Sequence, residues 1–365
     1  MNRANKKDTA FVTGATGLVG SYLTKVLLEN GHKVYCLARP KKDKSAKQRV
    51  FDVLDFWDKD TLIGYKNNLI VYEGDITEEG LGLKEKEKRT LKTEINQIFH
   101  CAALTEFNSP LEILRKVNVI GTKNVIESAL TIENLKKINH VSTAYVCGDY
   151  TGIFTENDLD VGQNFKTPYE KSKYEAEKLI EGYRSHGCWI NIFRPTLILG
   201  ESSSGRTFIF DQAFYQVLKL LNSELFDFFP YNVKMVFNAT FVDQLCEIMA
   251  NICMKGFEKN VTLHPFRNPG LSLKNAFNIS AEMLLFEKTK LIEMDKFLAE
   301  NFSAVQKKIL EYNLFFLSTK CKLSSEESLD YFKKFNQTIT AFNKEKFQDL
   351  LKYCFQSGFL KKHCP

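Results

Sequence analysis

The sequence lacks several features that would place it in other classes of protein. It contains nine cysteines, none of them paired in Cys-x-x-Cys spacing, and only six histidines. This pattern favours neither a zinc site nor a framework of disulfide bonds. We therefore expect no bound metal, and we expect the chain to work in a reducing, cytoplasmic compartment.

Long apolar runs and dense charge are missing as well. No uninterrupted apolar stretch of roughly 18 residues occurs, and the opening residues, MNRANKKDTA, lead almost directly into the first predicted strand. We expect neither a signal peptide nor a transmembrane segment. The 50 Lys and Arg residues against 44 Asp and Glu give a net charge of +6. This mild excess suits an anionic cofactor or substrate better than nucleic acid, which usually requires clustered charge.

What the chain does contain begins with a glycine-rich turn. Residues 9–20, TAFVTGATGLVG, join a short apolar run to three glycines spaced three apart, and a helical pattern follows. This is the sequence form of a strand, turn and helix that bind a dinucleotide. Gly14 allows a sharp turn, Gly17 lets the backbone approach a pyrophosphate, and Gly20 lets the helix pack on the strand. The predicted cofactor contacts here are Gly14, Thr16, Gly17, Leu18, Val19 and Gly20.

The end of the second predicted strand, residues 33–38, indicates which cofactor binds. Proteins that prefer NAD usually carry an acidic residue here for the ribose 2′-OH, whereas this chain has Arg39, followed by a proline and two lysines. A guanidinium suits a 2′-phosphate, which favours NADPH, and Arg49 is a candidate second ligand. The alternative is a solvated basic loop, because charge runs often follow strands.

Other strand ends supply further candidate contacts. In residues 69–76, LIVYEGDI, Asp75 is placed to accept a hydrogen bond from an adenine amino group, with an ordinary turn residue as the alternative. Small residues after the strand at 97–100 would let the backbone pass close to the cofactor, and we interpret His100 as structural rather than catalytic. The predicted contacts at these ends are Asp75, Ile76, Ala102, Ala103 and, after the strand at 190–194, Pro195 and Thr196.

The order of the predicted elements indicates the fold. Strands alternate with helices through the first part of the chain, which is typical of the α/β class with a doubly wound parallel sheet. We assign residues 1–200, completed by about 236–264, to a Rossmann domain that binds the cofactor. Residues 201–235 and 265–365 are assigned to a smaller, mainly helical part that binds substrate.

Aromatic residues mark this second part. Eight phenylalanines lie between Gly205 and Phe241, and we favour core packing for them over an apolar surface that binds an acyl chain. Phe347, Leu350, Leu351 and Phe355 have helical spacing. We interpret them as a docking face rather than a membrane anchor.

Tyr169 and Lys173 carry the predicted chemistry. They lie four residues apart in a helical pattern, so their side chains share one face about one turn apart. A free phenol has a pKa of about 10 and is a poor acid at neutral pH, and a nearby ammonium lowers that pKa. Tyr169 can then exchange a proton with a carbonyl or alcohol oxygen while hydride moves to or from nicotinamide, and Lys173 can bind the nicotinamide ribose. A chance pair of exposed residues is the alternative.

Two more residues strengthen the catalytic interpretation. Thr143 ends a predicted strand 26 positions before Tyr169, which brings both side chains to the carboxyl edge of the sheet. Its hydroxyl would stabilise charge on the substrate oxygen, and Ser142 competes for this role. Asn118 interrupts a predicted helix over residues 111–131, and such breaks of local propensity often mark sites.

Together these segments resemble a known family. The ordered set TGATGLVG, GDIT, HCAA, VNVIGT, VSTAYVCG, YEKSK and RPTLILG is similar to extended short-chain dehydrogenases/reductases over roughly residues 8–200. The resemblance implies a catalytic triad of Thr143, Tyr169 and Lys173, with Asn118 as a supporting residue. It also implies cofactor contacts from the three glycines, Arg39 and Asp75.

Three phrases point within that family. GDITEEGLGLK, YEKSKYEAEKL and RPTLILGESSSGRT resemble the thioester-reductase-like and fatty acyl-CoA reductase-like branch. This implies an NADPH-dependent reductase that converts an acyl thioester, bound to CoA or to an acyl carrier protein, into an aldehyde or alcohol. We expect such a substrate or carrier to be a separate molecule. An NAD(P)-dependent sugar epimerase, dehydratase or ketone reductase is one alternative, and a non-catalytic NADP-binding regulatory protein is another.

Overall fold

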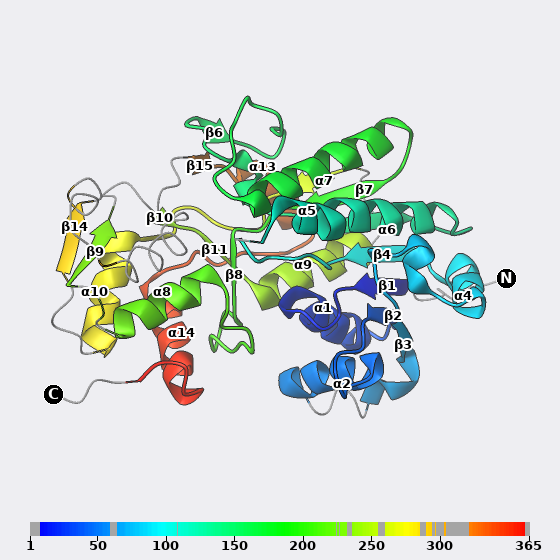
Figure 1. The fold of residues 1–365 in the computed structure, drawn as a ribbon, viewed down its shortest axis with the longest axis horizontal. Helices are drawn as coiled ribbons and strands as arrows, with labels where there is room; N and C mark the ends of the chain where they lie inside the picture. The colour runs from blue at the N-terminus through cyan, green and yellow to red at the C-terminus, as the bar shows by residue number, and fades with distance from the viewer. Residues whose placement is uncertain are drawn as a thin grey trace.

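A seven-stranded, fully parallel sheet forms the centre of the computed structural model (Figure 1). The structure describes residues 8–58, 64–107, 109–223, 225, 227–231, 236–254, 260–284, 290–293, 296, 303 and 321–361. The strand order is β12-β7-β5-β4-β1-β2-β3. The strands are β1 (Thr9–Thr13), β2 (Lys33–Ala38), β3 (Leu69–Glu73), β4 (Gln97–His100), β5 (Lys137–Val141), β7 (Ile190–Phe193) and β12 (Thr262–Leu263).

The central strands are buried on both faces. All five residues of β1 are buried, as expected for apolar strands that helices cover on either side. In register, Val12 of β1 lies between Cys36 of β2 and Phe99 of β4. The strand order reverses between β1 and β4, and open α/β sheets bind ligands at such a switch point. The predicted doubly wound sheet is confirmed.

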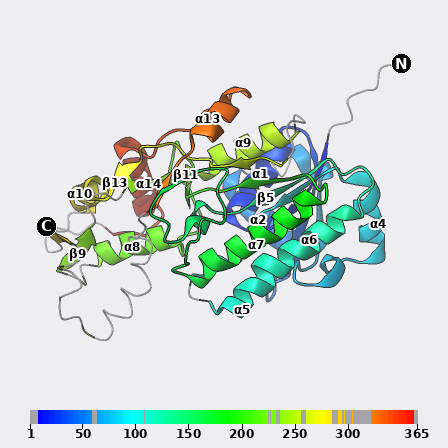
Figure 2. The ribbon, with the colours of Figure 1, turned by 90° about the horizontal axis from the view of Figure 1, so that it is seen from above.

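Helices cover the two faces of the sheet (Figures 1 and 2). On one face α1 (Leu18–Glu29), α2 (Ala46–Trp57) and α9 (Val242–Met254) share a core with β1 and β2. On the other face α4 (Glu85–Glu94), α6 (Gly121–Leu130) and α7 (Pro168–Ser185) form a second core. The helix predicted over residues 111–131 is divided into α5 (Leu111–Leu114), the π-helical η3 (Arg115–Ile120) and α6.

A third core belongs to the C-terminal part, which lies beyond the carboxyl ends of the sheet strands (Figure 1). Phe214, Phe229, Phe237 and Phe241 are buried in it, which agrees with the core-packing interpretation. Phe226 lies outside the described residues. The helices of this part are α8 (Ala213–Asn222), α10 (Leu273–Leu284), α13 (Glu326–Lys333) and α14 (Lys344–Gln356).

The remaining described elements are short. The strands are β6 (Ile153–Phe154), β8 (Leu197–Leu199), β9 (Phe228–Tyr231), β10 (Val236–Phe237), β11 (Ala239–Phe241), β13 (Leu271–Ser272), β14 (Lys290–Glu293) and β15 (Lys322–Leu323). The single-turn helices are η1 (Lys66–Asn68), η2 (Glu79–Gly82) and η4 (Ala144–Cys147).

The C-terminal segments divide between two cores. Tyr331 and Phe332 of α13 are buried with the helices α1 and α9, against the sheet. Phe347 and Leu350 of α14 are buried in the C-terminal core instead, so this apolar face docks within the chain. The proposed division into a cofactor domain and a substrate part remains a prediction. None of the described helices combines the length and the apolar character needed to cross a membrane.

Two helical glycines differ sharply in their surroundings. A Cβ atom at Gly20 in α1 would stand 2.2 Å from the carbonyl oxygen of Gly14, whereas one at Gly182 in α7 would meet nothing within 4 Å. We expect Gly20→Ala to lower the free energy of unfolding by roughly 1–3 kcal/mol, because the helix must move off the strand. Gly182→Ala should raise it by about 0.5–1 kcal/mol, because alanine favours the helix. Thermal unfolding of both variants tests this, and equal shifts of Tm would contradict the close contact.

Candidate active site

The glycine turn places an open helix end at the carboxyl edge of the sheet. Gly14 has a φ of 73°, and Gly17 donates its N–H to the Gly14 carbonyl over 2.9 Å. Gly17 is the N-cap of α1, with no side-chain hydrogen bond at the cap and no acidic residue in the first turn. The N–H groups of Leu18 and Val19 begin the helix there. Such an end favours an anion, as the predicted pyrophosphate contact requires.

Two arginines, Arg39 and Arg49, lie next to this turn. Arg49 of α2 donates to the carbonyl oxygen of Arg39 over 2.5 Å and to Thr16 Oγ1 over 3.3 Å. Burial and the neighbouring charge of Arg39 lower the pKa of Arg49. The Arg39 side chain is 66% exposed. An anion held between the two like charges would relieve their repulsion, so this pair suits a 2′-phosphate better than a hydroxyl.

Asp75 and Ile76 follow β3 on the same side of the sheet. Asp75 accepts hydrogen bonds from the Thr77 N–H over 2.9 Å and from Arg39 over 3.2 Å. Although burial acts in the opposite direction, these bonds leave the pKa of Asp75 below its ordinary value. The carbonyl of Ile76 accepts from Asn124 over 2.8 Å. A Cβ at Gly121 would stand 2.7 Å from Cδ1 of Ile76. Close packing against Ile76 therefore explains the glycine in this helix.

The end of β4 passes directly beside the glycine turn. A Cβ at Gly14 would lie 2.6 Å from the N atom of Ala102, and this N–H donates to Thr13 Oγ1 over 3.4 Å. Ala103 is half-buried. The structure thus brings Ala102 to the turn that holds Gly14, as the cofactor prediction requires, and Ala103 follows it in the chain.

Asn118 fixes the next residue of that segment. From the π-helical η3, its Oδ1 accepts from the N–H of Leu104 over 2.8 Å, and its Nδ2 donates to the Leu104 carbonyl over 3.0 Å. Nδ2 also donates to Ser172 Oγ over 2.9 Å. Through these bonds the Asn118 amide holds the segment after β4 in position. π-Helical turns often occur at functional sites, and here the turn inserts Asn118 between β4 and α7.

The two hydroxyl residues after β5 face opposite ways. Ser142 Oγ donates to Glu177, a fully buried carboxylate. Thr143 instead faces Tyr169: a hydrogen bond between their side chains acts to lower the pKa of Tyr169, although burial raises it overall. Thr143 Oγ1 also accepts from the N–H of Tyr145 over 3.3 Å. Of the two candidates, Thr143 therefore has the geometry for the catalytic hydroxyl.

Lys173 shares a face of α7 with Tyr169 but points elsewhere. Its Nζ donates to the carbonyl of Val141 over 2.9 Å and lies 3.1 Å from Nε2 of His140. Burial lowers the pKa of Lys173 to about 8. The expected lowering of the Tyr169 pKa by this ammonium is not present in this arrangement, because the buried ammonium uses the acceptors of β5.

Pro195 and Thr196 adjoin the catalytic strand end. The carbonyl of Pro195 accepts from the Ala144 N–H over 2.9 Å and from Thr143 Oγ1 over 3.5 Å. Thr196 is held by Thr240, whose Oγ1 accepts from the Thr196 N–H over 3.1 Å. The loop after β7 therefore lies beside Thr143, as expected for the nicotinamide end of the site.

Sequence analysis missed three residues that shape this site. Phe107 packs edge-on against the Tyr169 ring with centroids 5.2 Å apart. Glu177 receives a forked set of hydrogen bonds from Arg194, the shortest 2.8 Å, and His140 contacts Lys173. Tyr169, Lys173 and Glu177 follow one another at intervals of four residues, and this spacing was the available signal for Glu177. A polar residue within the buried strand KINHV was the signal for His140.

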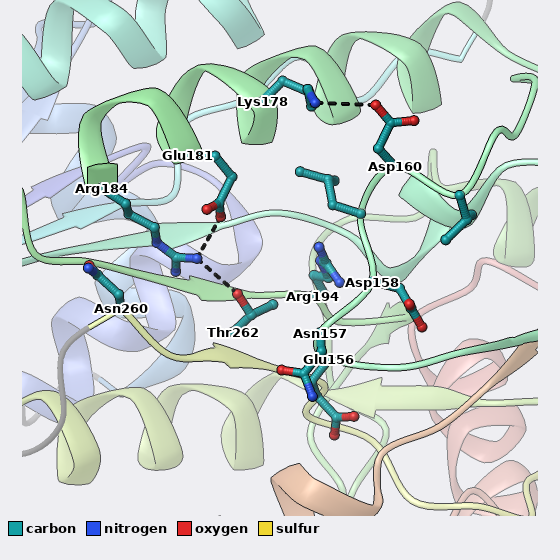
Figure 3. Close-up of a pocket in the computed structure, with 12 residues that line it drawn as sticks. Glu156, Asn157, Asp158, Asp160, Lys178, Glu181, Arg184, Arg194, Asn260 and Thr262 are labelled. Carbon is teal, nitrogen blue, oxygen red and sulfur yellow. Dashed lines mark hydrogen bonds and ion pairs between the residues drawn. The ribbon is translucent and has the colours of Figure 1, made fainter. Parts of the chain in front are cut away.

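A separate groove lies at the edge of the sheet (Figure 3). Its volume is about 450 Å³, and it lies between α7, the loop at 156–161 and the region of β12. Two ion pairs lie in its lining, Lys178 with Asp160 at 3.2 Å and Arg184 with Glu181 at 2.7 Å. The lining also contains Glu156, Asp158 and Arg194. None of the predicted site residues lines it. The described residues also contain no group of three metal-ligating side chains.

Comparisons with known proteins identify the family and the fold. The NAD-binding family model described as "Male sterility protein" matches residues 12–249. The chain is similar to the nonribosomal peptide synthetase asaC of Aspergillus flavus, with 32% identity over 56% of this chain and 21% of that protein. It is also similar to the putative fatty acyl-CoA reductase CG8306 of Drosophila melanogaster, with 36% identity over 37% of this chain and 28% of that protein.

A solved structure is similar along nearly the whole chain. The terminal R domain from the myxalamid PKS-NRPS biosynthetic pathway aligns with a TM-score of 0.84 and 24% identity, covering 98% of this chain and 93% of that one. The chain spans only about a quarter of the length of the two curated relatives. The predicted fold and the predicted relationship to extended short-chain dehydrogenases/reductases are confirmed, as is a nicotinamide cofactor.

The pair of guanidiniums generates a test of cofactor preference. We expect Arg39→Asp to weaken NADPH binding roughly 10- to 100-fold, because it removes a charge-assisted bond to the 2′-phosphate and adds repulsion. NADH binding should change far less. Lys86→Asp in α4 alters the net charge equally at a distance from the glycine turn and should leave both affinities unchanged. Fluorescence titration measures all four, and equal losses for NADPH and NADH would contradict a role in 2′-phosphate recognition.

Proposed function

This chain belongs to the NAD-binding family described as "Male sterility protein", and we propose that it is an NADPH-dependent reductase of acyl thioesters. One observation carries the proposal. The Thr143 hydroxyl interacts with the Tyr169 phenol at the carboxyl end of β5. Only β4 separates β5 from β1, which leads into the open N-terminus of α1. A dinucleotide lying across this edge would place its phosphates at α1 and its nicotinamide near Tyr169.

The choice of substrate rests on relatives. One similar protein is a putative fatty acyl-CoA reductase and another a nonribosomal peptide synthetase. An acyl group bound as a thioester, on CoA or on an acyl carrier protein, is the substrate class that suits both the fatty acyl-CoA reductase and the sequence resemblance. We place the enzyme in the cytoplasm, since the described cysteines are all free thiols, as a reducing compartment requires.

The side chains would divide the work at the acyl carbonyl. Bound NADPH supplies a hydride to the carbonyl carbon. Thr143 would donate a hydrogen bond to the carbonyl oxygen and stabilise the negative charge that develops on it. Because burial raises the pKa of Tyr169, its phenol stays protonated at neutral pH and can give up the proton that reduction consumes. Loss of the thiol then yields an aldehyde, and reduction of the aldehyde to the alcohol would consume a second NADPH and a second proton.

Lys173 would act on the cofactor rather than on the substrate. Two of its three N–H donors are directed to β5, which leaves one for the nicotinamide ribose. Asn118 would act through the backbone of Leu104, and the hydrogen bond of Ser142 to Glu177 keeps Ser142 from competing with Thr143.

Turnover with a panel of thioesters tests the proposal. We expect NADPH consumption with acyl-CoA or acyl carrier substrates, followed by absorbance. Tyr169→Phe should lower kcat by roughly 10²- to 10⁴-fold, because the proton donor is lost, while NADPH affinity stays close to that of the wild type. Tyr183→Phe, on an outer face of the same helix, is the matched control and should keep its activity.

A second pair of variants separates the two hydroxyls. Thr143→Val should lose most turnover, whereas Ser142→Ala should keep it and lose about 1 kcal/mol of stability through its bond to Glu177. Absence of turnover by the wild type across the panel would sink the proposal. Turnover of ketones or sugar nucleotides in its place would favour the epimerase, dehydratase or ketone-reductase alternative.

A further inference from the structure

The ammonium of Lys173 sits on a buried pair of histidines. Lys173, His140 and His100 are each 1% exposed. His140, on β5, lies 3.1 Å from the Lys173 Nζ through its Nε2. The ring of His100, on the neighbouring strand β4, lies 5.1 Å from the ring of His140, centroid to centroid. This arrangement places two polar rings beneath the lysine of the predicted triad.

Hydrogen bonding assigns the proton on His140. An ammonium has only donors, so His140 Nε2 must accept from Lys173 and its proton resides on Nδ1. That Nδ1 is buried and has no partner among the described residues. A buried polar atom without a partner is costly, and an apolar residue in the same strand would avoid the cost. Its presence therefore points to a role for the opposite ring nitrogen.

The two histidines contribute no charge to the site. Burial, with the nearby Lys173 charge, lowers the pKa of His100 to about 3 and holds the pKa of His140 well below its ordinary value. His100 is occupied elsewhere, with Nδ1 2.8 Å from Thr13 Oγ1 and Nε2 3.0 Å from Thr122 Oγ1. Of these two described histidines, only His140 is hydrogen-bonded to Lys173.

Among the described residues, few other titratable groups surround Lys173. Glu177, one turn further along α7, and Cys101, after β4, act to raise the pKa of Lys173, against the larger effect of burial. Glu177 is itself bonded to Arg194, which follows β7. Tyr169 lies one turn back on α7. A neutral acceptor at position 140 therefore holds the ammonium in place without adding a second carboxylate.

We propose that His140 is a positioning residue that holds the ammonium of Lys173 against the end of β5, so that its remaining N–H is presented to the nicotinamide ribose. The role of Lys173 in this statement rests on the proposed function. The Val141 carbonyl and His140 Nε2 together fix the direction of the lysine side chain, because two acceptors on one strand define it better than either alone.

The dependence of NADPH affinity on pH tests this inference. If the ammonium binds the ribose, affinity falls as pH rises through the pKa of Lys173, which is about 8. In His140→Leu the ammonium loses an acceptor, its charged form is less stable, and we expect this fall to move about one pH unit lower. His140→Gln can present an oxygen at a similar reach and should restore the wild-type profile. Fluorescence titration with NADPH from about pH 6 to pH 10 measures the shift.

Two further variants serve as controls for this test. His140→Asn keeps polarity but is too short to reach Nζ, so it should shift the profile as leucine does, even if leucine prevents folding. His100→Leu removes an equally buried imidazole that is not hydrogen-bonded to Lys173 and should leave the pH profile in place. An unshifted profile in both His140→Leu and His140→Asn, or in the folded one of the two, would overturn the inference.

This readout is independent of the substrate. If the wild type reduces no thioester but the binding profile moves in His140→Asn, the positioning role stands and the proposed substrate class fails. If thioesters are reduced and the profile does not move, the reductase stands and the positioning role fails. A wild-type profile with no fall at alkaline pH also counts against it.

Discussion

The carbonyl oxygen of Gly14 lies so close to α1 that a single Cβ atom at Gly20 would stand 2.2 Å from it. This contact lets the helix begin directly above the end of β1, with its first N–H groups turned toward the carboxyl edge of the sheet. Ala102 closes on the turn from the other side. Every other part of the site is placed relative to this point, because the parallel strands deliver their end residues to the same edge.

The charged side chains at the two ends of that edge differ in how exposed they are. At the end beside β2, Arg39 is exposed and Arg49 is only partly buried, so their positive charges are open to solvent. At the end beside β7, Glu177 and Arg194 are buried as a pair, which keeps their charges from the reacting groups. Burial of an unpaired carboxylate would be far more costly. The site thus offers charged groups to one end of a dinucleotide. To the other end it offers uncharged groups, apart from Lys173.

Local patterns predicted much of this arrangement, and tertiary contacts decided the rest. Three short-range features can be recognised in the sequence: the glycine spacing, the apolar strands and the four-residue interval between Tyr169 and Lys173. The fold that they predicted is confirmed. Which hydroxyl faces Tyr169 depends on Glu177, a residue 35 positions from Ser142. The direction of Lys173 likewise depends on an acceptor 33 positions away. The burial of α13 in the core that α1, α9 and the sheet share also had no local signal.

The most direct measurement is a crystal structure with bound NADP⁺. The account predicts the 2′-phosphate between the guanidiniums of Arg39 and Arg49, the pyrophosphate at the N-terminus of α1, and the nicotinamide ribose within hydrogen-bonding distance of Lys173. A dinucleotide bound in the reverse direction, or one whose 2′-phosphate contacts neither arginine while its nicotinamide lies away from Tyr169, would contradict it.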